Sequence, residues 1–133
     1  MGQTKQIRAV DGFALGAYEA MPAGDPRGSV VVIQEIFGVN EHIRDVTDGY
    51  AAAGYYAIAP QIFDRVERDV ELGYTDQDMA QGIEIARQKL DLTLTLSDVQ
   101  AAVDAASAYG RVGVVGYCFG GLLTWLAACE LDG

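Results

Sequence analysis

The residues with the clearest chemical potential form the segment 116–120 (GYCFG), which directly follows an apolar run. It is a Gly-x-Cys-x-Gly pattern, in which a nucleophile occupies a sharp turn between a strand and a helix. Side chains two residues before and after such a turn would clash, so Gly116 and Gly120 suit their positions. Phe119 would open the helix beside the sulfur, where a helix N-terminus favours a thiolate. The pattern predicts that Cys118 is a nucleophile.

The glycine-rich segment 116–121 has three alternative interpretations, and the spacing of its residues excludes two of them. The segment also fits a plain glycine-rich turn with Cys118 as a small buried side chain, because free cysteine is often buried. A dinucleotide-binding loop needs Gly-x-Gly-x-x-Gly, but Gly113 and Gly116 lie three residues apart. A phosphate-binding loop needs Gly-Lys-Ser/Thr, which the chain lacks. The nucleophile and the buried filler therefore remain the two interpretations of Cys118.

A second candidate group lies at the end of an earlier apolar run. Residues 29–35 read SVVVIQE, and their β-branched centre is typical of a strand buried on both faces. Glu35 ends this strand, and a carboxyl group beside a thiol could take or hold its proton. The alternative is that Glu35 is a solvated carboxylate at a strand end.

Strand and helix signals alternate along the rest of the chain. Two short strands around the Asp11-Gly12 turn come first, followed by a loop over 21–28. From Ser29 onward the alternation predicts a parallel sheet with helices on its faces. Strands are expected at 29–35, 55–59 and 111–115, with an irregular stretch at 61–73. The first expected helix is capped by Asn40 and ended by Gly54, and the last covers 119–129. Between them, apolar stripes with helical spacing run from Thr75 to Leu90 and from Leu96 to Ala106, with a joint at 91–95.

Composition excludes several classes of protein. The chain has 133 residues, 50% hydrophobic and 21% charged, which is typical of one globular domain. A net charge of -10 argues against nucleic acid as a partner. No apolar run approaches the roughly 20 residues of a membrane span, and no residues have the spacing of metal ligands.

The two cysteines indicate a redox environment. Cys118 and Cys129 lie eleven residues apart, which on a helix is about 16 Å. A disulfide needs Cα atoms within about 7 Å, so an internal bridge is not expected. A reducing compartment, the cytoplasm, is the predicted location.

Two segments together carry a family resemblance. Residues 34–40 (QEIFGVN) and 116–121 (GYCFGG) resemble the dienelactone hydrolase (carboxymethylenebutenolidase) family of α/β-hydrolases, and the resemblance runs from about Ile7 to the last residue. It implies a three-layer α/β fold with a mostly parallel sheet. It also implies a small-molecule ester or lactone as substrate, with no cofactor.

The resemblance implies a role for each site residue. Cys118 would be the nucleophile, and the backbone N–H groups of Ile36 and Phe119 would form the oxyanion hole. Glu35 would contact the thiol in the resting enzyme and swing away when the substrate arrives.

The chain departs from the family pattern after the nucleophile. The family triad is Cys, Asp and His, with Asp and His following Cys, but the fifteen residues after Cys118 hold Glu130 and Asp132 and no histidine. The single histidine, His42, is interpreted as a surface residue in the first turn of a helix. The family's best-known members bind a substrate carboxylate through an arginine near Ala80. No arginine of this chain matches that position, because Arg87 is on the same helix but out of register. Dienelactone is therefore only one candidate substrate.

The sheet is expected to be incomplete. An α/β-hydrolase of this family needs about eight strands, whereas five are predicted here. Residues 1–133 would thus be an incomplete domain without its C-terminal strands and helices. The chain could be a piece of a full hydrolase, a subunit of a split enzyme, or a truncated non-catalytic α/β binding module. In the first two cases hydrolysis needs the missing Asp/His segment, and a second chain or swapped segment would cover the edge of strand 112–115.

Overall fold

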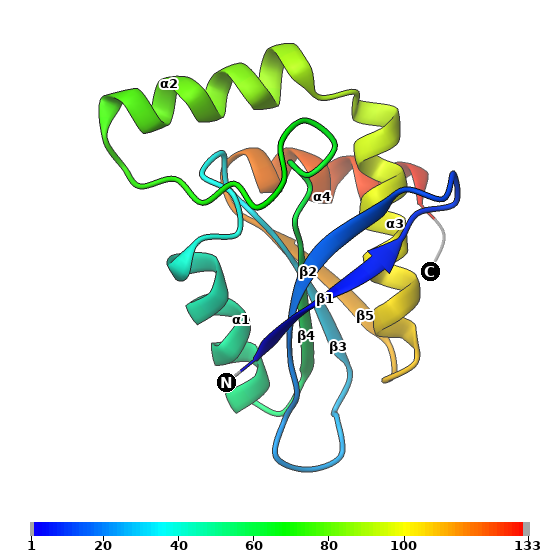
Figure 1. Cartoon of the computed structure of the whole chain (residues 1–133). Helices are drawn as coiled ribbons and strands as arrows, with labels where there is room; N and C mark the ends of the chain where they lie inside the picture. Colours follow the sequence, from blue (N-terminus) through cyan, green and yellow to red (C-terminus); the bar gives the residue numbers. More distant parts are fainter. Residues whose placement is uncertain (1, 132–133) are drawn as a thin grey trace.

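In the computed structural model, which describes residues 2–131, five strands form one mixed sheet in the order β1-β2-β4-β3-β5 (Figure 1). β1 pairs antiparallel with β2, and β2 pairs antiparallel with β4. β3 pairs in parallel with both β4 and β5, which confirms the parallel pairing predicted from Ser29 onward. The strands are β1 (Gln3–Arg8), β2 (Ala14–Ala20), β3 (Ser29–Ile33), β4 (Tyr56–Pro60) and β5 (Val112–Gly116).

Helices cover both faces of the sheet and confirm the predicted three-layer class. The helices are α1 (Glu41–Ala52), α2 (Asp76–Glu84), the one-turn π-helix η1 (Ile85–Lys89), α3 (Leu92–Ser107) and α4 (Phe119–Glu130). Successive residues of a strand face opposite sides. Val30 and Val32 therefore pack with Ile43 of α1, whereas Val31 and Ile33 join the larger core formed by α3 and α4.

Side chains at the predicted positions start two of the helices. Asn40 caps α1 by accepting the Ile43 N–H at 3.2 Å. Thr75 and Asp78 form the predicted capping box at the start of α2. These caps satisfy N–H groups that have no partner within their helices, so the predicted helix starts are confirmed.

The joint predicted at 91–95 is wrong beyond its first residue. Asp91 caps α3 by accepting the Leu94 N–H at 3.1 Å, and the helix runs on from Leu92. The Thr95 hydroxyl donates to the Asp91 carbonyl at 2.9 Å, and Thr95 is fully buried. Burial and this back-bond outweigh the weak helix propensity of threonine.

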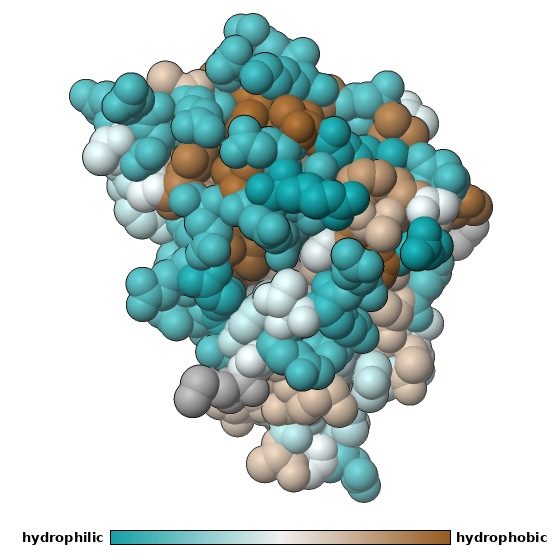
Figure 2. All heavy atoms as spheres, in the orientation of Figure 1, coloured by the Kyte–Doolittle hydropathy of each residue, from teal (hydrophilic) through white to brown (hydrophobic). Residues whose placement is uncertain are grey.

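The topology leaves an opening at the carboxyl ends of β3 and β5. These strands are neighbours, but the helices that follow them, α1 and α4, lie on opposite faces of the sheet. Ligands of open α/β sheets bind where the connections diverge in this way. In Figure 1, α2 lies above this end of the sheet. Figure 2 shows that the visible face is mostly hydrophilic, with apolar side chains gathered at the level of α2.

Candidate active site

Cys118 lies at the turn between β5 and α4 in a strained backbone conformation. Its φ is 55° and its ψ is -117°, in a region that residues other than glycine rarely adopt. Such strain concentrates at functional sites. Cys118 is exposed, so its interpretation as a buried filler is wrong.

The turn brings backbone groups into close contact. A Cβ atom at Gly116 would overlap the Gly120 carbonyl oxygen. A Cβ atom at Gly120 would lie 2.5 Å from the Ile33 carbonyl oxygen and 2.6 Å from that of Gln34. Glycine at both positions therefore lets the first turn of α4 lie directly against the end of β3.

Two backbone N–H groups near the sulfur have no protein partner. The N–H groups of Gly120 and Gly121 donate to the Tyr117 and Cys118 carbonyls, both at 2.9 Å. Within residues 2–131, the N–H groups of Ile36 and Phe119 donate to no other group of the chain. A pair of free donors beside a nucleophile is the arrangement that stabilises an oxyanion.

One cavity of about 670 Å³ is lined by Cys118, Ile36 and Phe119 together. Its walls come from the carboxyl end of β3, from α2 and η1, and from the start of α4. Most of the lining is apolar, which suits a small organic ligand. The lining residues are Ile36, Phe37, Met79, Ile83, Ala86, Arg87, Leu90, Leu92, Cys118, Phe119 and Leu122.

Arg87 is a cavity residue that the sequence pattern placed out of register. It lies in η1, where the chain forms a π turn instead of continuing the α-helix. A π turn inserts an extra residue, which changes the side that later residues face. Helical spacing alone therefore could not have placed Arg87, and no local signal marks the π turn.

Glu35 lies beside the site but not in its cavity. It is half-buried and immediately precedes Ile36. Within the described residues, no hydrogen bond or ion pair joins its carboxylate to another side chain, Cys118 included. The structure thus brings Cys118, Ile36 and Phe119 to one cavity, whereas Glu35 is outside the cavity wall and makes no hydrogen bond to the sulfur.

Residues 35–39, the loop predicted to contribute to an oxyanion hole and termed the oxyanion loop, are held by close backbone contacts on two sides. Gly38 has a φ of 82°, and a Cβ atom there would overlap the Val70 carbonyl oxygen. On the other side, a Cβ atom at Gly82 of α2 would overlap the Ile36 carbonyl oxygen. The two glycines allow the neighbouring segments to press against the loop from both sides.

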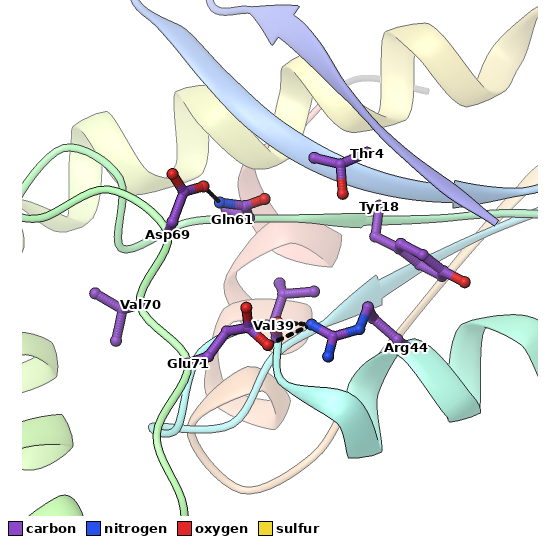
Figure 3. Close-up of a pocket in the computed structure, with 8 residues that line it drawn as sticks. All are labelled: Thr4, Tyr18, Val39, Arg44, Gln61, Asp69, Val70 and Glu71. Atoms are coloured by element: carbon purple, nitrogen blue, oxygen red, sulfur yellow. Dashed lines mark hydrogen bonds and ion pairs between the residues drawn. The ribbon is translucent and has the colours of Figure 1, made fainter.

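A small polar pocket lies behind this loop (Figure 3). Its volume is about 120 Å³. Arg44 lies at its wall and donates to the Val39 carbonyl at 3.0 Å and to Glu71 at 2.6 Å. Gln61 donates to Asp69 at 2.8 Å in the same pocket. The two bonds of Arg44 tie the loop to the neighbouring segment at Glu71.

A pair of tyrosines supports the other side of the turn. The nearby Tyr117 hydroxyl, together with burial, raises the pKa of Tyr50 of α1. Tyr117 thus places the turn at Cys118 close to the helix on the opposite face of the sheet.

The residues that could act as a base lie elsewhere. His42 is exposed in the first turn of α1, as predicted, and lines a separate open hollow with Tyr74. Glu130 is exposed at the end of α4, and Asp132 lies outside the described residues. None of the described candidates is in the wall of the Cys118 cavity.

Metal sites and membrane-spanning helices are absent from the described part of the chain. Residues 2–131 contain no group of three His, Cys, Asp or Glu side chains placed to hold a metal ion. Over the same residues, each helix is too short or too polar to cross a bilayer. Cys118 and Cys129 are both free thiols.

Comparison with known proteins decides the family. The model of the Dienelactone hydrolase family matches residues 15–133. The chain belongs to the dienelactone hydrolase family. A candidate carboxymethylenebutenolidase of Synechocystis is 46% identical over 107 residues, covering 74% of this chain and 42% of the relative. The carboxymethylenebutenolidase of Pseudomonas putida is 33% identical over 128 residues, covering 93% of this chain and 54% of the relative.

Solved structures agree with this assignment. A candidate dienelactone hydrolase of Klebsiella pneumoniae superposes with a TM-score of 0.76 at 30% identity, covering 98% of this chain and 55% of that chain. The chain therefore spans about half the length of the dienelactone hydrolase relatives that it matches. Residues 2–131 contain the strained turn at Cys118 and the free N–H groups of Ile36 and Phe119.

Proposed function

We propose that this chain carries the nucleophile and the oxyanion hole of a hydrolase that cleaves a lactone or an ester. One observation carries the proposal: Cys118, at φ 55°, shares a cavity with Ile36 and Phe119, whose N–H groups have no partner within residues 2–131. Membership of the dienelactone hydrolase family supports the same chemistry.

The first chemical step is acylation of the sulfur. The thiol proton passes to a base, the sulfur attacks the ester carbonyl, and negative charge develops on the carbonyl oxygen. The N–H groups of Ile36 and Phe119 stabilise that charge. The carbon–oxygen bond of the ester then breaks, and the leaving alkoxide takes a proton. The acyl group remains on Cys118 as a thioester.

Glu35 is proposed to handle the thiol proton in the resting state. This role comes from the family resemblance, and the position of Glu35 next to Ile36 supports it. The side chain must rotate toward the sulfur, since it makes no hydrogen bond to Cys118 in the described structure. Glu35→Gln should change the reactivity of Cys118 more than it changes the stability of the fold.

The second step, hydrolysis of the thioester, needs a positioned base that activates water. We propose that a further segment bearing the family's Asp and His supplies this base. The open edge of β5 supports the idea, because an unpaired apolar edge can accept another strand. A groove of about 250 Å³ runs beside it, and Trp125 of α4 is 71% exposed. The groove is lined by Val103, Val112, Val114, Thr124, Ala127, Ala128 and Leu131.

Arg87 suggests the class of substrate. Arg87 is the charged residue among the mostly apolar residues that line the cavity, and a guanidinium can pair with a carboxylate. We therefore propose an ester or lactone that carries an anionic substituent. Replacing Arg87 by Met should weaken binding of such substrates and leave neutral esters unaffected.

A thiol nucleophile must remain reduced. Cys118 and Cys129 are both exposed and unpaired. Since exposed thiols persist where the environment keeps them reduced, we propose a reducing compartment, the cytoplasm.

A non-catalytic binding module is the second candidate. The observation that favours it is the lack of a histidine or carboxylate in the walls of the described cavity. Such a module would bind a small molecule in the same cavity without transferring an acyl group to Cys118.

Selective alkylation distinguishes the two candidates. Cys118 lies at the amino end of α4, where partial positive charge favours an anionic sulfur, and Cys129 lies near the carboxyl end, which disfavours one. Iodoacetamide should therefore modify Cys118 at least about ten-fold faster than Cys129. The Cys118→Ala and Cys129→Ala variants assign the two rates. Equal rates in the folded chain would count against the hydrolase.

A further inference from the structure

Gln34, between the end of β3 and the oxyanion loop, has a fully buried side chain that bridges two backbone segments. Its Nε2 donates to the Glu35 carbonyl oxygen at 3.0 Å. Its Oε1 accepts the Ile62 N–H at 3.1 Å. A buried amide with both ends bonded has one fixed orientation. Gln34 therefore connects the oxyanion loop rigidly to the segment that follows β4.

The bonded carbonyl belongs to the peptide unit that contains the Ile36 N–H. A peptide unit is planar, and this one is trans like the others within residues 2–131, so the Glu35 C=O and the Ile36 N–H point in opposite directions. The Gly38 N–H also approaches this carbonyl, at 3.4 Å. Fixing the carbonyl on one side fixes the direction of the N–H on the other.

We propose that Gln34 is a positioning residue that aims the Ile36 N–H into the Cys118 cavity. The inference rests on the proposed function, since it assigns a cause to the geometry of the oxyanion hole. The bond from Gln34 also polarises the peptide unit, which makes the Ile36 N–H a stronger donor. Gln34 acts through Ile36 and touches no reacting atom.

The alternative role for Gln34 is structural, because it satisfies the buried N–H of Ile62. Two reactions of Cys118 separate the roles. Acylation by p-nitrophenyl acetate develops an oxyanion and needs the Ile36 N–H. Alkylation by iodoacetamide displaces iodide at carbon and develops no oxyanion. A structural defect would slow both reactions together.

The test compares Gln34→Met with Gln61→Met in the full chain. Gln61 also follows the end of a strand, and its side-chain amide donates to Asp64 and to Asp69. The bond to Asp69 lies in the polar pocket shown in Figure 3. Gln34→Met should slow acylation about ten- to a hundred-fold and change alkylation less than about two-fold. Gln61→Met should change neither. Equal slowing of both reactions by Gln34→Met, or unchanged acylation, would overturn the proposal.

Two additions keep the test decisive. Should Gln34→Met fail to fold, Gln34→Glu retains an acceptor for Ile62, and at a pH where its carboxylate is ionised it has no donor for Glu35 and should show the same selective loss. The residual dipolar coupling of the Ile36 N–H reports its direction and does not depend on activity. It should change in the Gln34 variant and not in Gln61→Met. An unchanged coupling would refute the positioning role, whereas an absence of wild-type acylation would refute the proposed function instead.

Discussion

The two edges of the sheet differ in their chemistry. β1 carries charged and amide side chains along its length, with Lys5 in an ion pair to Glu19 at 2.8 Å. Figure 2 shows the mostly hydrophilic face around it. β5, at the other edge, reads VGVVG and carries no charge. It borders an apolar groove, and the neighbouring helix exposes Trp125.

Ionic contacts also hold the β1 side to the rest of the fold. Arg65 donates to Asp98 of α3 through two bonds of 2.8 Å and to Asp11 of the β1–β2 turn at 2.8 and 3.1 Å. The bonds from Arg65 lower the pKa of Asp11 to about 2. No comparable ionic contact joins α4 to its neighbours within residues 2–131.

The contrast indicates what each edge faces. Charged side chains on an edge strand, especially lysine, prevent further strand pairing, so β1 is suited to water. An apolar edge beside an apolar groove is suited to protein. The Cys118 cavity lies at the carboxyl end of β5, so a segment packed against this edge would lie next to Cys118.

The largest effect on stability is expected at the tightly packed turn between β5 and α4. In Gly120→Ala, the new Cβ would meet the Ile33 and Gln34 carbonyl oxygens, so unfolding free energy should fall by about 3 kcal/mol or more. Gly113→Ala, in the middle of β5, places its Cβ no closer than 4.0 Å to the Ser29 carbonyl and should change stability by less than about 0.5 kcal/mol. Urea unfolding measures both. Similar losses would contradict the assignment of close packing to the turn alone.

A medium effect is expected at the β1 side, and it depends on pH. Burial favours a raised pKa for Glu19, but hydrogen bonds from Lys5, Tyr56 and Gln3 outweigh it and hold the pKa below its ordinary value. A lowered pKa stabilises the fold above the unfolded-state value, and this contribution is lost as pH falls through the folded-state pKa. Glu19→Gln should therefore cost about 1–2 kcal/mol at pH 7 and much less at pH 3.

The matched control for this prediction is Glu67→Gln. Glu67 is exposed and forms no ion pair within the described residues. Urea unfolding at the two pH values should show no pH-dependent difference for it. An equal cost of Glu19→Gln at both values would mean that the ion pair with Lys5 does not stabilise the β1 edge.

The smallest effect on stability is expected on the apolar surface of α4. Trp125→Lys removes a side chain that is 71% exposed, so stability should change by less than about 0.5 kcal/mol. Self-association at high concentration, measured by sedimentation velocity, should nevertheless fall. Val10→Lys is the control, since Val10 is 97% exposed beside the β1–β2 turn. An equal effect of both variants on self-association would show that the apolar surface of α4 has no special role in association.

The sequence predicted the parts of the site that depend on strand ends. The glycine spacing around Cys118 and the apolar run before Glu35 reflect local sterics and burial, which a sequence carries directly. The alternation of elements then brings those strand ends to one edge of the sheet.

Other parts could not be predicted, because they depend on distant contacts. Arg87 reaches the cavity through a π turn that no spacing rule contains. The bond from the Ile62 N–H to the Gln34 side chain joins residues 28 positions apart. The contact of Gly82 with Ile36 depends on where α2 settles above the sheet.

Cys118 and the N–H groups of Ile36 and Phe119 are proposed to form an acylation site, and no residue described in the wall of their cavity could serve as the base for turnover. The decisive experiment mixes the purified 133-residue chain with p-nitrophenyl acetate and follows p-nitrophenol release and intact mass. We expect a burst of about one equivalent per chain, a single acetyl group on Cys118, and then a stall, because no described residue is positioned in the cavity to activate water. The burst should vanish in Cys118→Ala and persist in Cys129→Ala. Sustained turnover that Cys118→Ala abolishes, or no acylation of Cys118, would contradict this proposal.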